Sequence, residues 1–182
     1  GSDSAKTALR EADLEFGKIM EYINASPQHQ NSDLMILSDH GYSTISEVID
    51  IETLLESSNL VGSDGWLLAQ NGGCALFYLK NQKDVHLVSE LVEWLSSQVW
   101  CGTLCASERL GEVKGTVSLS SIMNEGKRSP DIIMSFNWDS SDNVNGYPGH
   151  VFSTGGAKNL GQHGSMSLHE MNNILICVWL TF

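Results

Sequence analysis

The residues best suited to metal chemistry lie in the segment Ser-Asp-His-Gly at positions 38–41. It directly follows residues 34–37, Leu-Met-Ile-Leu, an uninterrupted apolar run typical of a strand buried on both faces. In α/β sheets, ligands collect outside the carboxyl ends of such strands. Asp39 and His40 would supply one oxygen and one nitrogen there, a donor pair suited to zinc or a similar divalent ion.

Asp39 and His40 are adjacent, and adjacent side chains of a regular strand point to opposite faces of a sheet. For both to bind one ion, the chain must leave extended geometry at this point, which Gly41 makes easier because glycine has no Cβ. The competing interpretation is that Asp39 caps a turn and that His40 is incidental. Residue spacing alone leaves both interpretations open.

Two more histidines lie in glycine-rich segments. His163 occupies the segment Gly-Gln-His-Gly-Ser at 161–165, ahead of a predicted helix, and its flanking glycines would let it approach a site without steric conflict. An exposed loop histidine is the alternative at this position. His150 follows Tyr-Pro-Gly and is a candidate to line a substrate pocket. His169, in the first turn of the last predicted helix, is interpreted as structural or as support for a neighbouring ligand.

No catalytic nucleophile is assigned, because the sequence has no nucleophile elbow of the G-x-S-x-G type, no P-loop and no dinucleotide-binding fingerprint. Of the four cysteines, Cys74 and Cys177 lie in apolar runs and are predicted core residues. Cys101 and Cys105 form a C-x3-C pair with no second pair nearby, so they are only a weak zinc motif.

The elements that must position these residues alternate between helices and strands. Apolar side chains recur at steps of three and four residues in the predicted helices 5–25, 45–58, 85–99 and 167–174, the last opened by a capping box of Ser167 and Glu170. Short apolar runs predict strands at 34–37, 66–70, 74–79, 131–136 and 174–180, with a further strand within 113–119. The polar, Gly-rich stretch 137–162 is predicted to be a functional or disordered loop. The alternation indicates an α/β fold, a layered sandwich with a mostly parallel central sheet.

Composition restricts the classes of partner. The 182 residues include 22 acidic and 10 basic side chains, for a formal net charge of −12. This length suits one domain over residues 1–182, with residues 1–2 interpreted as a cloning remnant. The acidic balance argues against a nucleic-acid or anionic-membrane surface, since both need clustered Lys and Arg. A phosphorylated small molecule stays compatible if bound metal ions supply positive charge. No apolar run reaches the roughly 18 residues of a membrane span, and no feature indicates a compartment.

Three segments together resemble the alkaline phosphatase superfamily, specifically its type I phosphodiesterase/nucleotide pyrophosphatase branch. The first is the helix 5–23 leading through the apolar strand to Ser-Asp-His-Gly at 38–41. The second is Arg-Ser-Pro-Asp-Ile-Ile at 128–133, and the third is Gly-Gln-His-Gly-Ser-Met-Ser at 161–167, ahead of a helix and an apolar strand. The resemblance spans nearly the whole chain, although residues 62–126 match only in outline.

The resemblance implies an alkaline-phosphatase-like α/β sandwich that holds two divalent metal ions, usually zinc, at strand ends. Enzymes of this kind cleave phosphate monoesters or diesters through a Thr or Ser nucleophile. By the resemblance, Asp39 and His40 would bind the metal on the nucleophile side, and His163 would bind the other metal. Two ions a few ångströms apart stabilise the attacking and leaving oxygens of an in-line displacement.

The sequence departs from the family pattern at its start. Family members carry an Asp ligand, the nucleophile and a P-D-x-x-G-H motif upstream of the first helix, and this sequence contains none of them there. We therefore expect the C-terminal portion of a longer catalytic domain, incomplete at the N-terminal side. The isolated chain should bind metal weakly or not at all and should be inactive. Its uncovered sheet surface should favour self-association.

Two other functions are compatible with the same residues. Cofactor-independent phosphoglycerate mutases and phosphopentomutases share the Asp-His-Gly strand end, and such an isomerase would use two divalent ions such as manganese. A metal-free binding domain that kept the fold but lost catalysis is the non-enzymatic alternative. The nucleophile and ligand pattern of the upstream half would distinguish all three.

Overall fold

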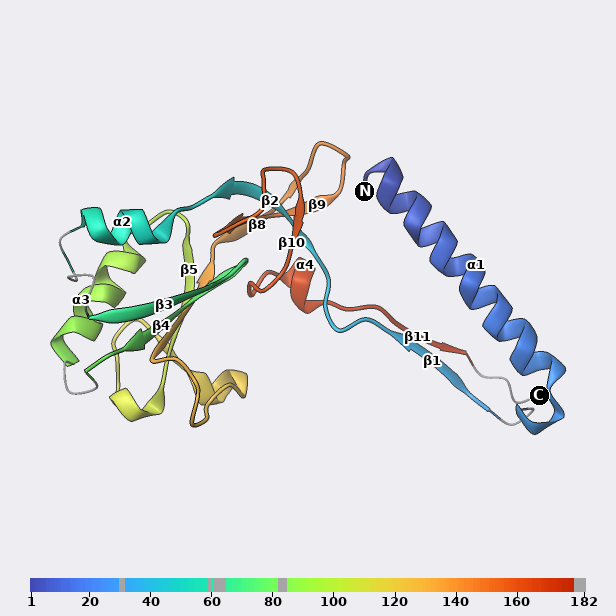
Figure 1. Cartoon of the computed structure of the whole chain (residues 1–182), viewed down its shortest axis with the longest axis horizontal. Helices are drawn as coiled ribbons and strands as arrows, with labels where there is room; N and C mark the ends of the chain where they lie inside the picture. Colours follow the sequence, from blue (N-terminus) through green and yellow to red (C-terminus); the bar gives the residue numbers. More distant parts are fainter. Residues whose placement is uncertain (30–31, 59, 61–64, 82–84, 179–182) are drawn as a thin grey trace.

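The computed structural model describes residues 1–29, 32–58, 60, 65–81 and 85–178, and its strands form three separate sheets (Figure 1). The five-stranded sheet has the order β3-β4-β7-β5-β6 and the four-stranded sheet the order β10-β2-β9-β8. A two-stranded ribbon pairs β1 with β11. The strand bounds are β1 Leu34–Leu37, β2 Ser43–Val48, β3 Trp66–Asn71, β4 Cys74–Leu79, β5 Cys101–Ala106, β6 Val117–Ser118, β7 Ile132–Phe136, β8 Trp138–Asp142, β9 Pro148–Ser153, β10 Gly161–Gln162 and β11 Leu175–Val178.

Four α-helices and three short 3-10 helices accompany the strands in the described part of the chain. The α-helices are α1 Asp3–Ala25, α2 Ile51–Ser57, α3 Val85–Ser96 and α4 Leu168–Met171. The 3-10 helices are η1 Pro27–His29, η2 Glu108–Leu110 and η3 Leu119–Ile122. None of the described helices is long and apolar enough to cross a membrane.

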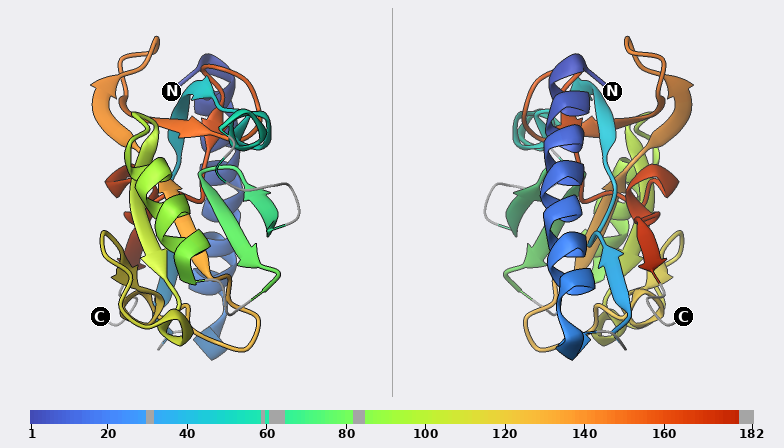
Figure 2. Two further views of the ribbon diagram at one scale, coloured as in Figure 1. Left: turned by 90° about the vertical axis from the view of Figure 1, so that its left-hand side faces the viewer. Right: turned by 90° about the vertical axis from the view of Figure 1, so that its right-hand side faces the viewer.

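The main core lies between α3 and the five-stranded sheet, as the end-on view shows (Figure 2). α3 presents Val88, Leu91 and Leu95 at helical spacing, and all three are fully buried. They face a sheet whose β4 and β7 contribute the fully buried Phe77 and Phe136. Burial of these side chains stabilises the sheet whose β3–β4 turn contacts the His163 loop.

The ribbon and α1 lie apart from the two larger sheets (Figure 1). α1 begins with Ser2 as its N-cap and contains no buried residue, so its apolar stripe stays exposed. In the ribbon, Met35 and Leu37 are more than half exposed, as is Leu175 opposite Leu37. The expectation that residues 34–37 are buried on both faces is therefore wrong in this structure, because each strand of the ribbon has only one neighbour.

We predict that the isolated chain self-associates through this ribbon, because a two-stranded apolar sheet is marginal in water and both its edges are open. The double variant Leu37→Lys/Leu175→Glu places an opposite-charge pair across the ribbon and should be monomeric by light scattering. The matched control is Val144→Lys, an equally exposed apolar residue outside the ribbon, which should leave association unchanged. A wild-type chain that stays monomeric at high concentration would contradict the prediction.

The α/β class is confirmed, whereas the mostly parallel central sheet is wrong for the described strands. Only β2–β9 and β5–β6 are parallel among their pairings, and the others are antiparallel. The predicted series of helices and strands missed three strands, because the polar stretch 137–162, which was predicted to be a loop, forms β8, β9 and β10. Its edge strand β8 is largely exposed, so its polar residues gave no apolar strand signal.

Three local predictions also need correction. The segment 45–58 is a strand to Val48 followed by the short helix α2. Residues 43–46 alternate between buried and half-buried positions, as in a strand with one covered face. The last helix covers only Leu168–Met171 instead of 167–174. Cys177 is exposed on the ribbon instead of buried, whereas Cys74 is buried as predicted. Residues 179–180 of the final apolar run lie outside the described residues.

Candidate functional site

The segment 38–42 connects the ribbon to β2 and is held against the segment around α4. The backbone N–H of Ser38 donates to the carbonyl of Ile174 at 3.1 Å, and the N–H of Gly41 donates to the carbonyl of Glu170 at 2.7 Å. A Cβ at Gly41 would lie on the carbonyl oxygen of His169 and 2.8 Å from that of Asn172. Glycine is therefore required at position 41 by the close approach of two backbones.

His40 lies in this segment with both ring nitrogens near polar atoms. Its Nδ1 is 2.8 Å from the carbonyl oxygen of Gly41. A carbonyl only accepts, so Nδ1 carries the proton. Its Nε2 is 3.5 Å from Oδ2 of Asp39, whose other oxygen accepts the backbone N–H of His40 at 3.1 Å. The chain has left regular strand geometry here, as binding of one ion by adjacent residues requires.

His163 comes from the loop between β10 and α4 and meets His40 directly. The two imidazole rings stack with centroids 4.1 Å apart and an interplanar angle of 18°. Tyr42 packs edge-on against both, at 5.3 Å from His40 and 5.5 Å from His163. The structure thus brings together the three predicted metal ligands Asp39, His40 and His163, although 123 residues (163 − 40) separate the two histidines in sequence.

The β3–β4 turn positions His163. This contact was not predicted from the sequence. The N–H of Gly73 donates to the carbonyl of His163 at 3.1 Å. A Cβ at Gly73 would lie 2.5 Å from the backbone nitrogen of Ser165. Gly164 has φ +106°, and a Cβ there would lie 2.8 Å from the carbonyl oxygen of Asn71. The Gly-Gly turn was recognisable as a hairpin signal, but its contact with the His163 loop is tertiary.

The donor set at Asp39 and His40 fits a divalent ion. Two ligand atoms of a tetrahedral zinc ion, each about 2.0–2.1 Å from the metal, are about 3.4 Å apart. The observed separation of Nε2 and Oδ2, 3.5 Å, matches that spacing. With Nδ1 donating to the carbonyl of Gly41, the lone pair of the imidazole lies on Nε2, where it is available to a cation. The Nδ1 bond to a backbone carbonyl is also the usual supporting contact of a metal-binding histidine.

His40 and His163 present two nearly parallel imidazole rings, with an interplanar angle of 18°. The lone pair of an imidazole lies in its ring plane, so the two rings would direct their lone pairs along separate layers. Among the described residues, no group of three or more His, Cys, Asp or Glu side chains could hold a metal ion. Each ion would therefore have fewer ligands from these residues than the three or four of ordinary zinc sites.

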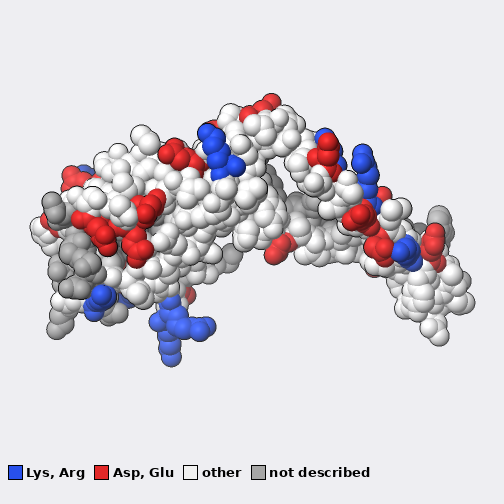
Figure 3. All heavy atoms as spheres, turned by 45° about the horizontal axis from the view of Figure 1, so that its top comes forward, with Lys and Arg blue, Asp and Glu red and all other residues white. Residues whose placement is uncertain are grey.

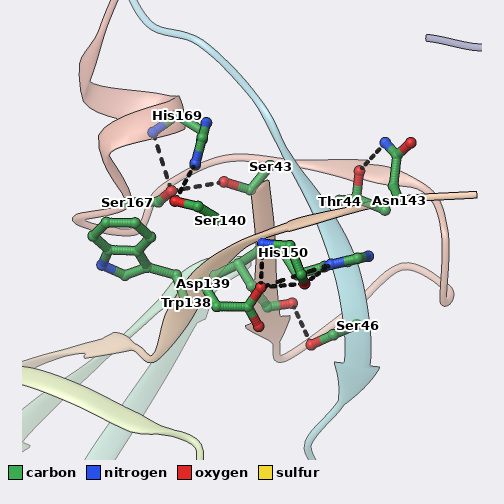
Figure 4. Close-up of polar contacts among 12 residues, drawn as sticks. Ser43, Thr44, Ser46, Trp138, Asp139, Ser140, Asn143, His150, Ser167 and His169 are labelled. Atoms are coloured by element: carbon green, nitrogen blue, oxygen red, sulfur yellow. Dashed lines mark hydrogen bonds and ion pairs between the residues drawn. The ribbon is translucent and has the colours of Figure 1, made fainter. Parts of the chain in front are cut away.

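His150 lies in a second polar cluster on β8 and β9 (Figure 4). Its Nδ1 is 2.9 Å from the hydroxyl of Ser141 and 3.9 Å from Oδ1 of Asp139. Hydrogen bonds from the side chain and backbone of Ser141 hold the pKa of Asp139 below its usual value, with smaller contributions from the nearby histidines His150 and His169. These contacts tie His150 to β8, and its assignment to substrate binding stays a prediction.

His169 has the structural surroundings expected of it. Its Nε2 is 3.0 Å from the hydroxyl of Ser140, and its ring packs edge-on against Trp138 (Figure 4).

The predicted capping box at the start of α4 is confirmed for Ser167 but not for Glu170. Ser167 accepts the N–H of His169, but the carboxylate of Glu170 reaches past Ser167 to Ser165.

The pair Cys101 and Cys105 does not form a zinc site. Both lie in β5, and a strand rises about 3.3 Å per residue, which places them roughly 13 Å apart. Burial raises the pKa of both thiols, that of Cys101 to about 11, which disfavours the thiolate that a zinc ligand needs.

The charged side chains on the surface agree with the acidic excess of the sequence, which has 22 acidic and 10 basic residues. Figure 3 shows Asp and Glu distributed over the visible face, while Lys and Arg occur in small separate groups. No continuous basic surface, of the kind that nucleic acid requires, is present on that face.

Comparisons with known proteins identify a family and two solved structures of similar fold. Residues 1–165 match the sequence model of a family described as type I phosphodiesterase/nucleotide pyrophosphatase. The fold is similar to solved structures of murine and human ectonucleotide pyrophosphatase/phosphodiesterase 5. The match to the murine protein has a TM-score of 0.60 and 16% sequence identity, and it covers 92% of this chain and 39% of the murine chain. The match to the human protein has a TM-score of 0.62 and 16% sequence identity, and it covers 99% of this chain and 44% of the human chain. This chain therefore spans less than half the length of either. No curated protein sequence matches it.

Proposed function

Because the chain belongs to the type I phosphodiesterase/nucleotide pyrophosphatase family, we propose that it forms part of a metal-dependent phosphodiesterase or nucleotide pyrophosphatase. Asp39 and His40 bind the divalent ion on the nucleophile side, and His163 binds the second. The substrate is a phosphorylated small molecule, and the nucleophile is supplied from outside these residues. The observation that carries the proposal is the stacking of His40 on His163, with Asp39 within 3.5 Å of His40.

The residues of this chain hold and orient donors in the proposed site. Bound divalent ions would supply the positive charge that stabilises the attacking and leaving oxygens of an in-line displacement. His40 offers Nε2 while Gly41 fixes its tautomer through Nδ1. One carboxylate oxygen of Asp39 accepts the backbone N–H of His40, and the other lies 3.5 Å from Nε2 of His40. Tyr42 limits rotation of both imidazoles by packing against their edges.

The activity test uses the protein that carries this chain together with an upstream half. We expect hydrolysis of bis-p-nitrophenyl phosphate that a chelator abolishes and that zinc restores. Asp39→Asn should reduce this hydrolysis strongly, because it weakens one of the few charged ligands of the ion. The isolated chain should be inactive under the same conditions. Hydrolysis that resists the chelator, or turnover by the isolated chain, would refute the proposal.

The isolated chain should bind zinc only weakly, because one proposed ion has two ligands from this chain and the other has one. Isothermal titration should therefore show no submicromolar zinc site. His40→Ala and His163→Ala should weaken binding further. The control His86→Ala alters an exposed histidine paired with Glu90 on α3 and should leave binding unchanged. Submicromolar affinity in the wild type, or equal loss in the control, would count against the assignment.

A non-catalytic domain of the same fold is the second candidate. The observation that favours it is the lack of a three-ligand group among the described residues. The same chelator experiment distinguishes the two, since a binding domain joined to its upstream half would hydrolyse nothing in either condition. The phosphomutase alternative has less support, because the family match is to phosphodiesterases.

A further inference from the structure

We infer that Glu170 is the positioning residue that holds the two halves of the proposed metal site together, an inference that rests on the proposed function for its catalytic meaning. Glu170 is 2% exposed and lies in α4, outside the proposed ligand set. Its carboxylate and its main-chain carbonyl bind different segments of the site. One residue therefore contacts both the segment that carries Asp39 and His40 and the segment that carries His163.

The side chain of Glu170 fixes the His163 loop. One carboxylate oxygen accepts the backbone N–H of Ser165 at 2.7 Å, and the other accepts the hydroxyl of Ser165 at 2.7 Å. Ser165 is two residues after His163, and Gly164 between them has no Cβ that could hold the loop by packing. Both oxygens of this carboxylate therefore accept hydrogen bonds from Ser165. Glu170 forms no ion pair among the described residues. Burial of an unpaired carboxylate is costly and is tolerated where its hydrogen bonds are needed.

The backbone of Glu170 fixes the other segment. Its carbonyl accepts the N–H of Gly41 at 2.7 Å, and the absence of a Cβ at Gly41 lets this segment approach α4. Residue 41 follows His40 directly and lies two residues after Asp39. Any rotation of α4 at Glu170 would therefore move the His163 loop relative to Asp39 and His40. The stacking of His40 on His163 is the geometric result of this double attachment.

The inference is tested by Glu170→Gln, which keeps the shape of the side chain but replaces one acceptor with a donor. In the wild type, the stacked rings should shift each other's imidazole proton resonances upfield. In Glu170→Gln these ring-current shifts of His40 and His163 should disappear, and zinc affinity should fall by about 10–100-fold, as for other residues that orient metal ligands. Ser165→Ala keeps the backbone bond to Glu170. It removes both bonds of the hydroxyl, the one donated to Glu170 and the one accepted from the N–H of Ser167, so it should show the same changes at smaller size.

The matched control is Asp131→Asn, another carboxylate that is 2% exposed and accepts a backbone N–H, that of Leu79, away from the site. It should lower stability without changing the ring-current shifts or the zinc affinity. If Glu170→Gln proves unfolded, Ser165→Ala decides the result alone. Retained stacking and unchanged zinc affinity in the folded variant would overturn the inference. Loss of stacking in Glu170→Gln, together with chelator-resistant hydrolysis by the protein that carries this chain and an upstream half, would uphold the inference and refute the proposed function.

Discussion

Gly41→Ala should lower the free energy of unfolding by about 1–3 kcal/mol, the range for forcing extra atoms into a closely packed position. The new Cβ would overlap the carbonyl oxygens of His169 and Asn172. These are backbone atoms, so the segment carrying Asp39 and His40 must move away from α4. The hydrogen bond from Gly41 to Glu170 would lengthen with it. Zinc affinity, followed by NMR titration, should fall at least tenfold, because a displacement of about 1 Å is large for a preorganised site.

Gly17→Ala is the matched control, since nothing lies within 4 Å of a Cβ at that position. Gly17 is in the interior of α1, where alanine is favoured over glycine by about 0.5–1 kcal/mol. The control should raise helicity by circular dichroism and leave zinc affinity unchanged. If Gly41→Ala kept wild-type stability and zinc affinity, the close contact between residue 41 and α4 would not be required for the site.

Asp131→Ala should be the most destabilising of the proposed changes, at about 3–5 kcal/mol, the range for removing one partner of a buried ion pair. One oxygen of the buried Asp131 carboxylate accepts Nε of Arg109 at 2.9 Å, and the other accepts the N–H of Leu79 at 2.7 Å. The variant leaves that N–H and the Nε–H of Arg109 without their acceptor, although the guanidinium still donates to the carbonyl of Ser129. Urea denaturation followed by tryptophan fluorescence would measure the loss.

The double-mutant cycle with Arg109→Ala separates the ion pair from the backbone bond. Arg109→Ala leaves the carboxylate buried with one donor, so it should also destabilise strongly, although the Arg109 side chain is 30% exposed. The double variant should lose less than the sum of the two single variants, because the remaining charge is no longer unpaired. Additive losses would indicate that Asp131 acts through Leu79 alone.

The local signals were sufficient for some of the elements and for the choice of candidate ligands. The strands at 66–70, 74–79 and 131–136 were predicted within a residue or two, because short apolar runs are local features. The segment 38–41 was recognisable because a polar Asp-His pair follows an apolar strand. Such features depend on neighbours in sequence and need no knowledge of the tertiary structure.

The parts that were missed depend on contacts between distant segments. Nothing near Glu170 in sequence indicates that its carbonyl receives Gly41 or that its carboxylate passes Ser167 to reach Ser165. The β3–β4 turn likewise contacts the His163 loop across 90 residues (163 − 73). The exposed strand β8 is polar along most of its length, so its pairing with β9 is visible only in the folded chain. In each case tertiary contact, which residue pattern does not encode, decides the outcome.

The most direct test of the central claim is zinc titration of the chain labelled with 15N, observing the ring nitrogens of all the histidines. We expect the Nε2 resonance of His40 to move toward the metal-bound range while its Nδ1 stays protonated on Gly41. His163 should respond over the same zinc concentrations, and His29 and His86, which lie outside the proposed ligand set, should not. If His40 and His163 do not respond, or respond no more than His29 and His86, these residues do not form part of a metal site.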